Sequence, residues 1–121
     1  MKWACTVKER DFEAFWIGIK RVEVRRKVPK IAVGDDLFIC NKDKVIRCEV
    51  SDVMTMDKSE AWYIYSCLLC IEKPRYYKYL IGVDDVSLVW VKVIEKVTGN
   101  DLAKFRSAVG RNPQWFSKVN F

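Results

Sequence analysis

The residues best suited to chemistry lie in one basic stretch between Gly18 and Lys30. Its charged side chains are Lys20, Arg21, Glu23, Arg25, Arg26, Lys27 and Lys30. Six cations against one acid give the stretch a charge of +5, in a chain whose net charge is +6. Such a concentration favours a polyanionic partner, of which nucleic acid is the commonest and an acidic membrane surface the second.

Within this stretch, Lys20 and Glu23 could form an acid/base pair. A lysine in a partly dry pocket can lose its proton easily enough to act as a base. The alternative is a surface ion pair, worth about 0–1 kcal/mol. The residue types alone favour the ion pair.

A second candidate contact is the run from Arg75 to Tyr79, which interleaves cations with aromatic rings. In nucleic-acid interfaces such rings stack on unpaired bases, at about 1–3 kcal/mol each, and the cations hold phosphates. Arg75, Tyr76 and Lys78 are therefore candidate contacts. The equal alternative is that alternate tyrosines pack against the core. Trp62 and Trp90 are further candidates for stacking on a base.

The chain has five cysteines and no histidine, which removes Cys/His zinc patterns and His-dependent catalytic triads. Cys67 and Cys70 match a Cys-x-x-Cys pattern, but we expect them in a strand, where residues three apart point to opposite faces. Buried structural thiols are favoured over a metal or redox site, and no cofactor or metal is expected. A contact between Cys40 and Cys48 across a hairpin is conceivable.

Length and hydropathy indicate one domain, residues 1–121, with enough apolar residues for a core. The longest apolar run is about five residues, against the roughly 18 that a membrane span needs. There is no pattern of a signal peptide. We therefore expect a cytoplasmic protein without a membrane partner.

The elements that must position these residues follow from hydrophobic periodicity. Alternating patterns predict six strands, and i, i+3, i+4 patterns with capping residues predict two or three short helices. The expected strands are 2–7, 21–25, 37–40, 45–54, 61–72 and 86–97, the expected helices 9–16 and 98–109, and the expected loops 55–60 and 73–79. Lys20 should share the face of Val22, beside the core or in a pocket. Strands joined mostly by hairpins suggest a small mixed or antiparallel barrel.

The stretch Gly18-Ile19-Lys20-Arg21-Val22-Glu23-Val24-Arg25 resembles the Gly-x-Lys-x-x-Glu-x-Arg motif of ASCH domains, and Val33-Gly34-Asp35 resembles the turn that follows it. ASCH domains belong to the PUA-like group, with the EVE and YTH domains. The resemblance implies an α+β fold, a PUA-like β-barrel with a cleft that binds nucleic acid. It places Lys20, Glu23 and Arg25 in the cleft, and the other cations of the basic stretch on its approach. EVE and YTH domains enclose a base in an aromatic cage, which Trp3, Trp62 and Trp90 could supply.

Three functions are consistent with this resemblance. The first is a domain that binds nucleic acid, RNA in preference to DNA, and recognises an unpaired or modified base. The second is a hydrolase of modified nucleosides, or an RNase, that uses Lys20 and Glu23. Some ASCH hydrolases have threonine where this chain has Glu23, a departure that weakens this alternative. The third is the modified-DNA reader module of a restriction system. The oligomeric state stays open.

Overall fold

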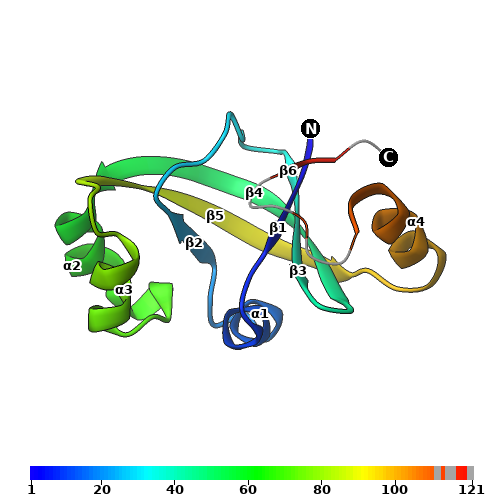
Figure 1. Cartoon of the computed structure of the whole chain (residues 1–121), viewed down its shortest axis with the longest axis horizontal. Coiled ribbons are helices and arrows are strands. Elements are labelled where there is room, and N and C mark those ends of the chain that lie inside the picture. Colours follow the sequence, from blue (N-terminus) through cyan, green and yellow to red (C-terminus); the bar gives the residue numbers. More distant parts are fainter. Residues whose placement is uncertain (111–112, 114–116, 120–121) are drawn as a thin grey trace.

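The computed structural model describes residues 1–110, 113 and 117–119, and its central feature is one six-stranded mixed sheet (Figure 1). The strands are β1 (Lys2–Thr6), β2 (Val22–Arg25), β3 (Asp36–Asn41), β4 (Lys44–Asp57), β5 (Asp85–Lys96) and β6 (Ser117–Lys118). The helices are α1 (Glu9–Trp16), α2 (Lys58–Leu69), α3 (Lys73–Tyr79) and α4 (Gly99–Val109). The long strands β4 and β5 run through the molecule, with α2 and α3 near one end and α4 near the other.

The sheet has the order β2-β5-β4-β3-β1-β6. Neighbouring strands are antiparallel, except β1 and β3, which are parallel. Among the described residues β2 and β6 form the two edges and do not pair with each other. The α+β class is confirmed, but the predicted closed barrel is not observed. One of the strands expected for the barrel, residues 61–72, is also missing, because helix α2 occupies this segment up to Leu69.

Most predicted strands are confirmed because their alternation matches a sheet with two different faces. On β1, Trp3 and Cys5 lie in a core cluster with α1, while Ala4 lies in a second cluster on the opposite face. Helix α1 has the predicted bounds, and its residues Phe12 and Phe15 are buried. The predicted turn at Gly34 is also present, with a φ of 90° that glycine adopts easily.

The segment from residue 55 to residue 79 was predicted wrongly. Strand β4 continues to Asp57, and helix α2 follows where a loop and a long strand were expected. The carboxylate of Asp57 accepts hydrogen bonds from the backbone N–H groups of Ser59 (2.9 Å) and Glu60 (3.0 Å), which caps the helix. Helix α3 replaces the predicted loop. Pro74 does not prevent this helix, because it lies in the first turn, where proline is tolerated.

Three apolar clusters hold the elements together. The first packs α1 against one face of the sheet, the second joins β2 and β5 to α2 and α3, and the third packs α4 against the opposite face. The third cluster contains Phe38 and Phe105, whose ring centroids are 5.2 Å apart. No helix in the described ranges is long and apolar enough to cross a membrane.

All five cysteines are free thiols. Burial raises the pKa of Cys40 and of Cys48 to about 12, which keeps both thiols protonated and unreactive. Their predicted contact is not formed, because Cys48 pairs with Leu37 across the hairpin. Cys67 lies in α2 and Cys70 at its end, so the argument from opposite strand faces was wrong. No cluster of three or more metal-binding side chains occurs in the described part of the chain.

Candidate functional site

A cavity of about 570 Å³ lies where the end of β1, the start of α1, strand β2 and helix α3 meet. We call it the site cavity. Its lining residues are Thr6, Val7, Lys8, Asp11, Glu23, Val24, Arg25, Ile71, Arg75, Lys78 and Tyr79. It therefore brings together part of the basic stretch and part of the run from residue 75 to residue 79, which are about fifty residues apart in the sequence.

Local geometry explains why these side chains reach the cavity. Strand β1 ends at Thr6, so the first turn of α1 carries Asp11 to the cavity wall. After α1, Gly18 adopts a φ of 84°, and the N–H of Lys20 donates to the carbonyl of Ala14 (3.0 Å). This reversal leads directly into β2, whose residue Glu23 faces the cavity.

Lys20 is the centre of an ion-pair network behind the cavity wall. Its side chain is 0% exposed, and its Nζ lies 3.2 Å from Oδ1 of Asp11 and 3.7 Å from Oε1 of Glu23. The amine also lies 5.4 Å from the centroid of the Phe15 ring. A buried charge is tolerated only when it is paired. The interpretation of Lys20 and Glu23 as a surface ion pair was therefore wrong.

Two arginines extend this network along the cavity wall. Nη2 of Arg25 donates to Oε2 of Glu23 (3.1 Å) and to the carbonyl of Thr6 (3.2 Å). Nη2 of Arg75 lies 3.6 Å from Oδ2 of Asp11. The charges thus alternate from Arg75 through Asp11, Lys20 and Glu23 to Arg25. Each carboxylate is shared between the buried amine and one guanidinium.

Lys20 does not line the cavity itself. Asp11 and Glu23 line it, and the buried amine holds both carboxylates in place. Only 5% of Glu23 is exposed, and its carboxylate lies between Lys20 and Arg25. The geometry therefore makes Lys20 a positioning residue in this conformation.

The remaining cations of the basic stretch are exposed. They form what we call the basic rim: Arg21, Arg26, Lys27 and Lys30. Nη1 of Arg26 donates to the carbonyl of Tyr79 (3.3 Å), which connects the end of β2 to the end of α3 beside the cavity. This contact places Arg26 beside the cavity, while Arg21 immediately precedes β2 and Lys27 and Lys30 lie in the connection between β2 and β3.

The predicted run on α3 divides into cavity and core residues. Arg75 and Lys78, two of the candidate contacts, line the cavity. The prediction of Tyr76 as a contact was wrong, because Tyr76 is fully buried and its hydroxyl donates to the carbonyl of Lys58 (2.7 Å). Burial raises the pKa of Tyr76 to about 12. Tyr79, which is 41% exposed, is the ring that lines the cavity instead.

None of the three candidate tryptophans lines the site cavity. Trp3 is in the core, and its indole N–H donates to Oδ2 of Asp35 (2.9 Å). The Trp62 ring packs 5.0 Å from that of Tyr76. The indole N–H of Trp90 points to the sulfur of Met54 (3.1 Å). These contacts are structural, so the predicted tryptophan cage is not formed here.

Sequence reasoning missed Asp11, Lys8 and Thr6. A signal for Asp11 was available, because Asp11 and Phe15 are four residues apart and so share one face of α1. An acid on the buried face of a helix needs a cationic partner, and Lys20 was the candidate within reach of the following turn. Lys8 and Thr6 had no such signal, since they reach the cavity only through the path of the chain between β1 and α1.

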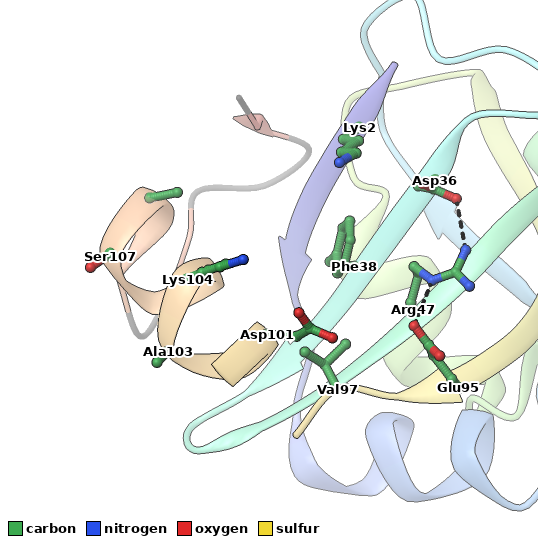
Figure 2. A pocket seen from close by; sticks show the side chains of 11 residues that line it. Lys2, Asp36, Phe38, Arg47, Glu95, Val97, Asp101, Ala103, Lys104 and Ser107 are labelled. Atoms are coloured by element: carbon green, nitrogen blue, oxygen red, sulfur yellow. Dashed lines mark hydrogen bonds and ion pairs between the residues drawn. The ribbon is translucent and has the colours of Figure 1, made fainter. Parts of the chain in front are cut away.

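A larger cavity, of about 880 Å³, lies between α4 and the outer face of the sheet (Figure 2). Its apolar floor includes Phe38 and Val97, and Arg47 is held between Asp36 (3.3 Å) and Glu95 (3.0 Å). Three cations and three acids line it, so it has no excess charge. It also contains none of the predicted site residues, and the site cavity is therefore the better candidate.

Comparison with family models identifies the family of this chain. The model of the ASCH domain family matches residues 6–98, and the chain therefore belongs to the ASCH family. This match confirms the resemblance carried by Lys20, Glu23 and Arg25, and with it the relationship to the PUA-like group. No curated protein matches the sequence.

Solved structures show the same fold. An ASCH protein from Zymomonas mobilis superposes with a TM-score of 0.77 at 18% identity, covering 97% of this chain and 88% of the other. A serine-to-alanine mutant of the Zymomonas mobilis protein gives 0.82 at 18% identity, over 98% and 88%. A protein from Pyrococcus furiosus gives 0.53 at 16% identity, over 78% and 99%. At these identities the similarity establishes the fold alone.

Proposed function

We propose that this ASCH domain binds single-stranded nucleic acid, RNA in preference to DNA, with one unpaired base in the site cavity. The observation that carries the proposal is the excess of positive charge in and around one concave site. Four cationic side chains and two acids line the cavity, and the four exposed cations of the basic rim precede or follow β2, which forms part of the cavity wall. A cavity of about 570 Å³ is within the usual range for small-ligand sites.

The positions of the side chains suggest which residues contact phosphates and which contact the base. The cations of the basic rim are exposed and hold the phosphates of the strand. Glu23 and Arg25 face the cavity, where a carboxylate accepts from the exocyclic amino group of a base and a guanidinium donates to ring or carbonyl acceptors. The half-exposed ring of Tyr79 offers a stacking surface at the cavity wall.

The hydrolase alternative receives less support from the geometry. It assigns the reacting role to Lys20, whose amine is fully buried between two carboxylates and does not line the cavity. A substrate would reach this amine only after Asp11 and Glu23 moved apart. The third alternative, a modified-DNA reader, would use the same cavity for a flipped base. Binding measurements with different nucleic acids distinguish it from the RNA-binding function.

The proposal is tested by fluorescence titrations at two salt concentrations with single-stranded RNA, single-stranded DNA and methylated duplex DNA. We expect RNA to bind most tightly, with an affinity that falls steeply as salt rises. Lys27→Gln combined with Lys30→Gln removes two rim charges without disturbing a described ion pair. This variant should lower the slope of log affinity against log salt by about 0.7 for each lost phosphate contact.

Lys73→Gln combined with Lys92→Gln is the matched control, since it removes two positive charges from exposed lysines outside the cavity and the rim. It should bind RNA like the wild type. If none of the three ligands binds even at low salt, or if the control weakens binding as much as the rim variant, the proposal is wrong. Tightest binding of methylated duplex DNA would favour the reader function instead.

A further inference from the structure

The charges of the site cavity are not balanced by the protein. Lys8, Arg25, Arg75 and Lys78 line the cavity together with only two carboxylates, those of Asp11 and Glu23. The buried amine of Lys20 adds a fifth positive charge directly behind the wall, so the balance at the site is +3. A neutral base or nucleoside would leave this excess without a counter-charge.

The two carboxylates cannot compensate the rest of the wall, because each is already shared. Asp11 lies between Lys20 (3.2 Å) and Arg75 (3.6 Å), and Glu23 lies between Lys20 (3.7 Å) and Arg25 (3.1 Å). Part of the negative charge of each carboxylate is therefore already compensated within the network. The cations that remain are those that an incoming anion meets.

Two of these cations have no ion-pair partner in the described part of the chain. Lys8 precedes the first turn of α1, and Lys78 lies one turn after Arg75 on α3, so the two lysines approach the cavity from different elements. Arg75 and Lys78 are three residues apart and share one face of the helix. Cations converging from separate elements on one cavity are arranged to surround an anion.

We infer that the site cavity contains a phosphate-binding subsite, formed by Lys8, Arg75 and Lys78, and that its preferred ligand is a nucleotide with a terminal phosphate. This inference rests on the proposed function. A terminal phosphate carries a charge of about −1.5 to −2 at pH 7, which matches the excess of positive charge better than the single charge of a phosphodiester. Arginine and lysine contacts to phosphate are strong because both partners are charged.

Isothermal titration calorimetry at low salt tests the subsite with the four ribonucleoside 5′-monophosphates, the matching nucleosides and inorganic phosphate. We expect at least one monophosphate to bind about tenfold or more tightly than its nucleoside, and inorganic phosphate to compete with it. A 5′-phosphorylated oligoribonucleotide should also bind more tightly than the same oligoribonucleotide with a 5′-hydroxyl group, which separates a terminal phosphate from internal phosphodiesters.

A variant with Lys8→Gln and Lys78→Gln should reduce the affinity for the monophosphate to that of the nucleoside. The matched control is Lys73→Gln with Lys92→Gln, which removes the same charge from two exposed lysines outside the cavity and should keep the preference. Equal binding of monophosphate and nucleoside by the wild type, or a preference that survives in the Lys8/Lys78 variant, overturns the subsite.

The two proposals fail in different ways. If wild-type protein binds single-stranded RNA but shows no preference for a phosphate, the subsite is wrong and the proposed function stands. If the monophosphate binds with the expected preference while long RNA does not bind, the subsite stands and the strand-binding function is wrong. If neither binds, both are overturned.

Discussion

At the residue scale, the motif identified Lys20 but not its burial. Its spacing from Glu23 indicated a pair, but a pair at spacing i, i+3 could lie on the surface or inside. The structure buries the amine and adds Asp11 as a second partner. Losing one partner of a buried ion pair typically costs about 3–5 kcal/mol, whereas a surface pair contributes about 0–1 kcal/mol. The role of this lysine is therefore decided by its burial.

Asp35 gives a prediction on pH dependence. Partial burial raises the pKa of its carboxyl, but hydrogen bonds from the N–H of Ala32 (2.9 Å) and the indole of Trp3 (2.9 Å), with the N-terminal ammonium at 3.1 Å, outweigh burial and lower this pKa. A lowered folded-state pKa stabilises the fold above the unfolded-state value of about 3.9, and this contribution is lost as the pH falls through the folded-state pKa.

Asp35→Asn should therefore destabilise the protein by about 1–3 kcal/mol at pH 7, and by less below pH 4. Urea unfolding at pH 7 and pH 3 measures both values. Asp84→Asn is the control, because the side chain of Asp84 is exposed and has no hydrogen bond or ion pair among the described residues. A difference between wild type and Asp35→Asn that stays constant with pH would contradict this account.

At the element scale, the strands were predictable and helices α2 and α3 were not. Alternation along β4, where Cys48 and Val50 are buried and Glu49 and Ser51 are exposed, reports directly which side chains face the core. The segment of α2 is rich in aromatic and branched residues, which favour strands when judged by composition. Its outward side chains include Tyr63, which is 88% exposed, so the helix lacks the clear polar face that would have identified it.

Asp57 caps the start of helix α2 and so contributes to its stability. Its carboxylate satisfies two backbone N–H groups at the start of α2, which would otherwise have no helical partner. Asp57→Ala should destabilise the protein by about 0.5–2 kcal/mol, measured by urea unfolding. Asp57→Asn is the control and should retain most of the stability, because asparagine caps about as well. Equal losses in the two variants would mean that charge, not capping, matters at this position.

At the scale of the whole molecule, the two faces of the sheet carry different clusters. One face carries the core cluster with α1 and leads to the site cavity, and the opposite face carries the cluster with α4. Phe105 of α4 is fully buried there. The buried contacts of α4 therefore stabilise the sheet without contributing residues to the site cavity.

Phe105→Ala should cost about 3–5 kcal/mol of stability, because a large aromatic side chain is removed from a packed cluster. Urea unfolding measures this loss. At a temperature where the variant remains folded, its affinity for single-stranded RNA should equal that of the wild type. A clear loss of RNA affinity in folded protein would show that the α4 face takes part in binding.

The sequence by itself determined strands β1 to β5, helix α1, helix α4 and the motif at Lys20, Glu23 and Arg25. These features depend on residues within a few positions of one another, where alternation and spacing are informative. Tertiary structure alone decided that the sheet stays open, that Asp11 and Arg75 join the site, and that Tyr76 and Trp3 are structural. These outcomes depend on which distant segments pack together, because burial and pairing of a side chain are set by neighbours that its local sequence does not specify.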